Sequence, residues 1–85
     1  MSKTIQVTFK FFASTREIIG QKELTVDLDR GTTAEEAFNK IIEKYPELTE
    51  NEKQLMIAVN KEIGDKKQRL NDGDEIAILP PVGGG

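Results

Sequence analysis

The 85-residue sequence contains no cysteine and no histidine. Without cysteine, the chain can form no disulfide and no thiolate nucleophile, and it offers no sulfur ligand to a metal. Without histidine, it lacks the commonest general base and metal-ligating side chain. Any chemistry in which the chain takes part must therefore use carboxylates, amines, hydroxyls or its own terminus. We expect no metal site and no stably bound cofactor.

Long apolar runs and strongly basic stretches are also missing. The longest apolar stretch, Leu55 to Val59, is far too short to cross a bilayer, and the first residues contain no signal-peptide core. We therefore expect a cytoplasmic protein with no membrane partner. The 12 basic residues are outnumbered by 15 acidic ones, and the net charge is −3. The basic cluster Lys66-Lys67-x-Arg69 precedes a turn and is interpreted as a solvated loop, so no nucleic-acid partner is expected.

Hydrophobic residues make up 36% of the chain and charged residues 32%, which is typical of one small globular domain. Two segments alternate apolar and polar residues, and this period of two predicts half-buried strands. The apolar members are Ile5, Val7, Phe9 and Phe11 in the first segment, and Leu24, Val26 and Leu28 in the second. We expect the two strands to form a hairpin. The connection, Ser14 to Gly20, is short, with room for one helical turn over Ile18-Ile19.

A helix is predicted between the turn at Asp29-Arg30-Gly31 and Pro46. Thr33-x-x-Glu36 forms a capping box at its start, with Thr32-x-x-Glu35 as the competing register. Apolar residues recur at helical spacing on one face. They are Ala34, Ala37, Phe38, Ile41, Ile42 and Tyr45.

The remaining segments complete an α+β domain. Leu55 to Val59 is interpreted as a buried strand, Leu70 to Asp74 as a turn, and Asp74 to Leu79 as the last strand. The segment between Asn60 and Leu70 leaves room for a further short strand. These elements would pack as one amphipathic helix on one mixed sheet. Their order along the chain is that of a β-grasp, ubiquitin-like roll, in which the first and last strands run parallel at the centre. We expect this domain to span residues 1–81, followed by a flexible reactive tail at 82–85.

The tail itself is thin. Pro80 and Pro81 set the exit direction and end the strand, and Val82 leads into Gly83, Gly84 and Gly85. Without side-chain bulk, such a tip can enter a narrow channel and present its carboxylate there. When extended, Val82 to Gly85 reaches about 13 Å. On the tail alone, an ordinary frayed end or an expression remnant is the better interpretation.

A second apolar surface is predicted on the sheet face that points away from the helix. If Ile76 and Ile78 face the helix, then Ala77 and Leu79 point to the other side. Met56 and Ala58 are expected to join them, and Phe12 begins that side or the loop after the first strand. A patch of this kind at the root of the tail favours a partner-binding surface over scattered surface apolar residues.

Three segments of the chain resemble the small, MoaD-like subunit of molybdopterin synthase, within the MoaD/ThiS group of ubiquitin-like sulfur carriers. The segments follow one another in the family's order, and the resemblance that they mark covers nearly the whole chain. They are Phe11-Phe12-Ala13-x-x-Arg16-Glu17-x-x-Gly20, Ala58-Val59-Asn60, and Leu70-x-Asp72-Gly73-Asp74-Glu75-x-Ala77-x-x-Pro80-Pro81-Val82-x-Gly84-Gly85. The Pro-Pro-Val-x-Gly-Gly ending is the most specific of these motifs.

This resemblance implies a non-catalytic sulfur carrier. An E1-like adenylyltransferase would use ATP to adenylate the carboxylate of Gly85, and a sulfur-transfer protein would supply the sulfur that converts it to a thiocarboxylate. The large subunit of molybdopterin synthase would receive the tail, and sulfur would pass to cyclic pyranopterin monophosphate in molybdenum cofactor biosynthesis. Phe12, Ile63 and Leu79 resemble the family's hydrophobic partner contacts. Pro80 and Pro81 belong to the same candidate surface.

Several alternatives stay open at this point. Arg16 is equally compatible with a partner contact and with a plain surface position. Asp72, Asp74 and Glu75 are interpreted as turn residues and a solvent-facing salt bridge. The same tail chemistry would serve a carrier for tRNA thiolation or thiamin synthesis. It would also serve a ubiquitin-like modifier, because an amine can attack an activated carboxyl where sulfur otherwise would. An inert β-grasp binding module is the remaining alternative.

Overall fold

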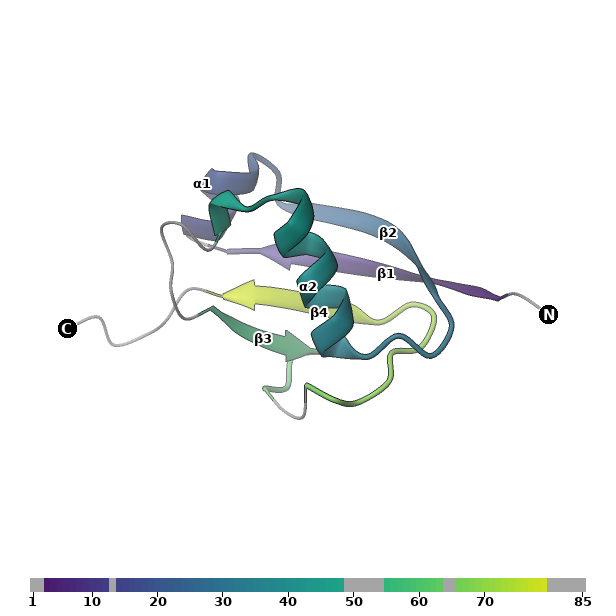
Figure 1. Ribbon diagram of the computed structural model, residues 1–85. Helices are drawn as coiled ribbons and strands as arrows, with labels where there is room; N and C mark the ends of the chain where they lie inside the picture. Colours follow the sequence, from purple (N-terminus) through teal and green to yellow (C-terminus); the bar gives the residue numbers. More distant parts are fainter. Residues whose placement is uncertain (1–2, 13, 49–54, 64–65, 80–85) are drawn as a thin grey trace.

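The computed structural model describes residues 3–12, 14–48, 55–63 and 66–79. Within these ranges the chain forms four strands and two helices (Figure 1). In chain order they are β1 (Thr4–Phe11), α1 (Ser14–Ile19), β2 (Glu23–Asp29), α2 (Ala34–Lys44), β3 (Met56–Val59) and β4 (Glu75–Leu79). The predicted α+β order of strand, strand, helix, strand and strand is confirmed.

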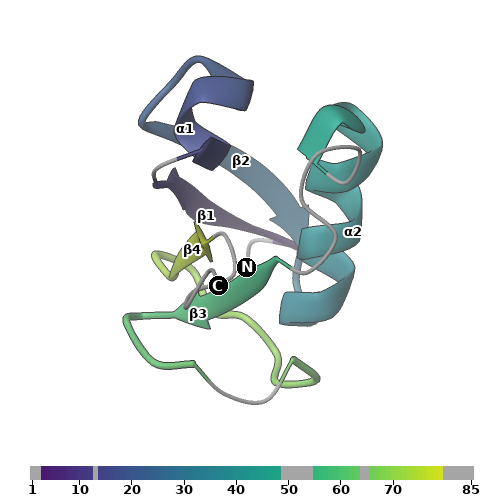
Figure 2. The same cartoon turned by 90° about the vertical axis from the view of Figure 1, so that its left-hand side faces the viewer.

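The strands form one mixed sheet in the order β2-β1-β4-β3. The first and last strands lie side by side and run parallel, with Phe9 opposite Ile76 and Phe11 opposite Ile78. β2 and β3 flank this central pair in antiparallel fashion. Helix α2 lies across one face of the sheet and supplies the crossover that parallel neighbours require (Figures 1 and 2). The predicted arrangement of the sheet is therefore correct.

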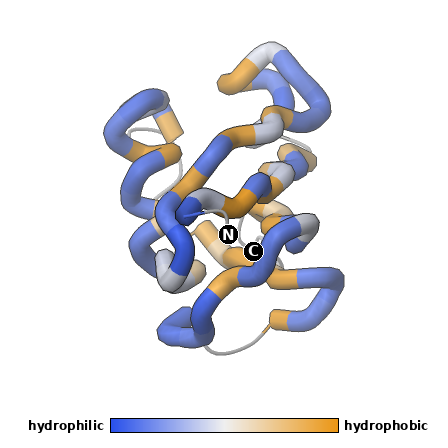
Figure 3. Tube along the Cα trace, turned by 90° about the vertical axis from the view of Figure 1, so that its right-hand side faces the viewer, coloured by the Kyte–Doolittle hydropathy of each residue, from blue (hydrophilic) through white to orange (hydrophobic). Residues whose placement is uncertain are grey.

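The core lies between α2 and the facing side of the sheet. Alternate residues of the strands point into it, and hydrophobic and hydrophilic positions alternate along the chain accordingly (Figure 3). Its buried members from the two central strands are Ile5, Val7, Phe9, Phe11, Ile76 and Ile78. Helix α2 contributes Ala34, Ala37 and Ile41. Because all six strand residues are at most 4% exposed, the central pair forms the rigid base from which the chain continues beyond Leu79.

The connection between β1 and β2 is more ordered than the sequence suggested. Instead of one turn over Ile18-Ile19, helix α1 occupies the whole of Ser14–Ile19. Gly20, with φ of +82°, ends the helix in the left-handed region and donates its N–H to the Arg16 carbonyl at 2.8 Å. The helix begins where Thr15 N donates to the Phe12 carbonyl at 3.0 Å.

Helix α2 begins with the predicted capping box. Thr33 Oγ1 accepts from Glu36 N at 3.2 Å, and Glu36 Oε1 accepts from Thr33 N at 2.9 Å. The competing register is wrong, because Thr32 is buried and donates its hydroxyl to the Asp29 carbonyl at 2.7 Å. The helix ends before Tyr45, in agreement with the prediction from Pro46.

The basic loop has a structural role that the sequence analysis did not anticipate. The Lys66 carbonyl accepts a hydrogen bond from the Glu35 N–H at 2.8 Å. The Gln68 carbonyl accepts one from the Ala34 N–H at 3.0 Å. These helix N–H groups have no partner within the helix itself. The side chains of the loop are exposed, as predicted, while its backbone completes the first turn of α2. In the described part of this segment only isolated bridges occur, at Thr33–Arg69 and Val59–Glu62, and no further strand.

We expect the capping box to make stability depend on pH below the ordinary glutamate range. The hydrogen bond from Thr33 N, followed by that with its hydroxyl, lowers the pKa of Glu36 from its usual 4.5. A depressed carboxyl pKa adds stability above the unfolded value and loses it as pH falls through the folded value. Glu36→Gln should therefore melt below the wild type near pH 7, and the gap should close below about pH 4.

The matched control is Glu35→Gln, which removes the same charge from the same helical turn without touching Thr33. Its melting temperature should track that of the wild type more closely across the same pH series. A constant gap between Glu36→Gln and the wild type from neutral to acid pH would show that the carboxylate form of Glu36 is not the stabilising species.

Candidate partner-docking face

The described chain stops at the point where the two central strands end together. β1 and β4 are parallel, and Phe11 pairs with Ile78, so Phe12 and Leu79 follow at the same end of adjacent strands. Phe12 is 38% exposed, which is unusual for a large aromatic residue, and Leu79 is half-buried. The structure thus brings these two predicted partner contacts together at the root of the tail.

Two further apolar residues extend this surface along the open face of the sheet. Met56 pairs with Leu79, and Ala77 lies on the same side of β4 as Leu79; both are partly exposed. We call Phe12, Met56, Ala77 and Leu79 the docking face. Ala58 was expected to join them but is only 5% exposed. Ala58 pairs with Ala77 and therefore faces the open side of the sheet, as expected, but its side chain is buried there.

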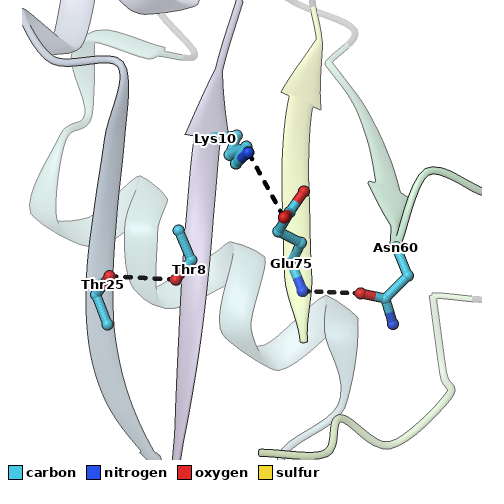
Figure 4. A network of polar contacts seen from close by, with 5 residues as sticks. All are labelled: Thr8, Lys10, Thr25, Asn60 and Glu75. Carbon is cyan, nitrogen blue, oxygen red and sulfur yellow. Dashed lines mark hydrogen bonds and ion pairs between the residues drawn. The ribbon is translucent and has the colours of Figure 1, made fainter. Parts of the chain in front are cut away.

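The rest of the open face is polar. Figure 4 shows Thr8 and Thr25 joined through their hydroxyls at 3.1 Å, and Lys10 paired with Glu75 at 3.5 Å. Asn60 accepts the Glu75 N–H at 3.0 Å on the other side of β4. The apolar residues are therefore confined to the end of the face where β4 finishes. A face divided in this way offers a partner an apolar centre with a polar rim.

Ile63 is placed away from this centre. It is 63% exposed, but it follows the reversal at Asn60-Lys61, beyond β3. Strands β4 and β3 lie between Ile63 and β1, the strand that leads to Phe12. Three strand spacings of about 4.8 Å therefore separate Ile63 from β1, a distance of roughly 14 Å. Ile63 can contact the same partner only at the edge of the docking face.

Arg16 lies beside Phe12, on α1. Its Nε donates a long hydrogen bond of 3.5 Å to the Phe11 carbonyl, and its side chain is exposed. It lines a shallow hollow of about 190 Å³. The other lining residues are Lys10, Phe11, Phe12, Lys22 and Glu23. Its charged residues are thus Lys10, Arg16, Lys22 and Glu23, and Lys10 is also paired with Glu75.

Lys10, Lys22 and the buried Thr15 next to Arg16 are not among the site residues predicted from the sequence. A signal existed for the lysines, because Lys10 is an open-face position two residues before Phe12 and Lys22 immediately precedes β2. For Thr15 the signal was its position three residues after Phe12. At this spacing a threonine hydroxyl often forms a hydrogen bond with the nearby backbone.

The acidic set has the structural role predicted for it. Asp72 Oδ1 accepts from Gln6 N, and Asp74 Oδ2 accepts from Asn71 N, each at 2.7 Å. Glu75 forms the ion pair with Lys10. The Asp72 and Asp74 contacts shape the turn before β4, at the end of the sheet opposite the docking face. Asp72 and Asp74 are consequently not candidates for partner binding.

The remaining predicted site residues, Pro80, Pro81, Val82, Gly83, Gly84 and Gly85, lie outside the described residues. In the described ranges, no group of three or more histidine, cysteine, aspartate or glutamate side chains is placed to hold a metal ion. Neither described helix is long and apolar enough to span a membrane.

Comparison with known proteins decides the family. Residues 9–85, from the middle of β1 to the last glycine, match the model of the ThiS family. The chain belongs to the ThiS family. Among curated relatives, it is 37% identical over 83 residues to the molybdopterin synthase sulfur carrier subunit of Chlamydomonas reinhardtii, covering 95% of this chain and 100% of the relative. The predicted resemblance is confirmed.

Solved structures of related proteins agree with this membership. The small archaeal modifier protein 1 of Methanosarcina acetivorans superimposes with a TM-score of 0.77 at 29% identity, covering 99% of this chain and 100% of the other. A subunit in the complex of subunits 1 and 2 of the molybdopterin-converting factor from Helicobacter pylori has a TM-score of 0.66 at 28% identity, with coverage of 95% and 100%. The β-grasp fold of the ThiS family is thereby confirmed for this chain.

Proposed function

We propose that this chain is the sulfur carrier subunit of a molybdopterin synthase, with the carboxylate of Gly85 as its reactive group. The observation that carries the proposal is the placement of Phe12 and Leu79, which meet at the end of the central strands from which the tail departs. Membership of the ThiS family and the curated relatives of nearly equal length support it. On this proposal the carrier is non-catalytic and cytoplasmic, and residues 82–85 are its tail.

The chemistry explains why the chain needs neither histidine nor cysteine. A carboxylate is a poor acyl donor, because its leaving group would be oxide. An E1-like adenylyltransferase would join the Gly85 carboxylate to the AMP part of ATP and release pyrophosphate. Sulfur from a sulfur-transfer protein would then displace AMP, which leaves a thiocarboxylate. Each proton transfer belongs to a partner, and the carrier supplies the carboxylate and the surface that docks it.

The free energy gained when the partner covers the docking face must offset the free-energy cost of ordering the tail in the partner's active site. Fixing four residues costs roughly 1–2 kcal/mol each, or about 4–8 kcal/mol in all. At about 25 cal/mol per Å² of apolar area, this corresponds to roughly 160–320 Å² buried. Four apolar side chains at the root of the tail are of the right size for that area. We propose that the large subunit of molybdopterin synthase covers the docking face, with Arg16 and Ile63 contacting it at the rim.

The complex named for the Helicobacter pylori structure supports a large-subunit partner for this chain. The resemblance to small archaeal modifier protein 1 favours a second candidate function, conjugation of Gly85 to a lysine of another protein. Both functions begin with the same acyl-adenylate. They differ in whether sulfur or an amine displaces AMP.

Intact mass spectrometry tests the proposal directly. After incubation with an E1-like adenylyltransferase, ATP and a sulfur donor, we expect the mass of the chain to rise by the difference between sulfur and oxygen, with the change located at Gly85. Omission of ATP should abolish the change. Recovery of the unmodified chain from the complete mixture would contradict sulfur carriage. Higher-mass conjugates linked through Gly85 to protein lysines would favour the modifier function.

A further inference from the structure

The hydroxyl of Thr15 is a buried polar group at the root of the tail. The side chain is 0% exposed, and Thr15 lies in the first turn of α1. Its Oγ1 accepts from Phe12 N at 2.9 Å and donates to the Phe12 carbonyl at 2.6 Å. It also lies 3.1 Å from the Ile78 carbonyl, 63 positions away in sequence. Because a hydroxyl carries one proton, the two carbonyl groups share it.

These contacts join the ends of the two central strands. The β1–β4 ladder pairs Phe11 with Ile78 and goes no further in register. Beyond that pair, the Phe12 N–H would lack a partner, and the Thr15 hydroxyl supplies one. The same hydroxyl holds the peptide of Ile78, one residue before Leu79. One side chain thus connects the aromatic anchor of the docking face to the strand that leads into the tail.

We propose that Thr15 is a positioning residue for sulfur carriage, which sets the direction of the tail relative to the docking face. This inference rests on the function proposed above. In the described chain, the Thr15 hydroxyl holds the last core residue before Leu79, so it fixes where and in which direction the chain leaves the sheet. Displacements of about 1 Å are enough to lower the rate of a reaction that depends on alignment.

Two variants separate the hydroxyl from the shape of the side chain. Thr15→Val keeps the volume and removes the hydrogen bonds, while Thr15→Ser keeps the hydroxyl and loses a methyl group. Thr32→Val is the matched control. Thr32 is the other buried polar residue in the described chain, and its hydroxyl also donates to a carbonyl, that of Asp29. Asp29 pairs with Thr4, at the opposite end of β1.

The kinetic test varies the concentration of thiocarboxylated carrier in the sulfur-transfer reaction of the large subunit, at a temperature where every variant is folded. For Thr15→Val we expect kcat to fall about 5- to 10-fold while KM stays within about 2-fold, because docking persists and alignment is lost. Thr15→Ser should recover most of kcat. Thr32→Val should match the wild type in both constants even though its melting temperature is lowered.

A structural readout tests the same inference without any partner. In NMR relaxation experiments, the backbone amides of Phe12 and Leu79 should gain mobility in Thr15→Val and not in Thr32→Val. Unchanged mobility together with unchanged kcat would overturn the inference, and so would a rise in KM alone. If the wild type itself acquires no sulfur, the proposed function fails, and the relaxation data still decide whether Thr15 holds the two strand ends.

Discussion

A chain that lacks Gly84 and Gly85 is expected to fold as the wild type does and to acquire no sulfur at all. Among the described residues the buried core extends no further along the chain than Ile78, so we expect removal of the last two glycines to leave the melting temperature unchanged. The carboxylate of Gly83 would stand about 7 Å short of the position that Gly85 reaches when the tail is extended. Thermal unfolding by circular dichroism and intact mass after the activation reaction measure the two effects.

Gly83→Ala provides the matched control, because it keeps the length of the tail and its terminal Gly-Gly pair. We expect this variant to accept sulfur at close to the wild-type rate. A marked drop in melting temperature on removal of Gly84 and Gly85 would show that the tail is part of the fold. Full sulfur delivery by a chain with a blocked or amidated terminus would refute the role of the Gly85 carboxylate.

The second large effect is expected at the docking face. Phe12→Asp or Leu79→Asp places a charge where the proposed interface is apolar, so the large subunit must either desolvate the carboxylate or give up the contact. Truncating central interface residues typically costs 2 kcal/mol or more, and we therefore expect Kd to rise at least about 30-fold. Titration calorimetry or surface plasmon resonance with the large subunit measures the change.

Thr25→Asp is the control for this pair of variants. Thr25 is exposed on the same open face, on the edge strand β2, away from the docking face. The affinity of the Thr25→Asp variant for the large subunit should stay within about 3-fold of the wild type, because a charge outside the apolar centre changes affinity little. The rise in Kd caused by Ile63→Asp should lie between these two limits. Wild-type affinity in both Phe12→Asp and Leu79→Asp would exclude the docking face as the partner-binding surface.

The parts of the fold that depend on neighbours in sequence could be predicted from sequence. The alternation in β1 and β2 and the helical spacing in α2 follow from which face each residue must bury. The Thr33–Glu36 capping box was predictable because both partners lie within one helical turn. The parallel pairing of β1 with β4 was expected because the element order is that of a β-grasp roll, and the chain between the two strands is long enough for the crossover that parallel neighbours need.

The candidate site was predictable only in part. Phe12 and Leu79 emerged because strand alternation places them off the core face, and the structure confirms that they end adjacent strands. The side that Ala58 faces was predicted correctly, since Ala58 pairs with Ala77, but alternation does not say whether a position on that side is exposed, and Ala58 is buried. Arg16 could be named from the resemblance, but the hollow around it also depends on Lys10 of β1 and on Lys22, just before β2.

By itself, the sequence determined the elements, their order, the absence of cysteine and histidine chemistry, and the glycine-ended tail. These follow from composition and from interactions between residues a few positions apart. Tertiary structure alone decided that α1 is a full helix, that the loop at 66–69 completes the start of α2, and that the Thr15 hydroxyl holds Ile78 across 63 positions. The reason is physical: a hydrogen bond between distant residues leaves no periodic trace along the chain and forms only once packing has brought its partners together.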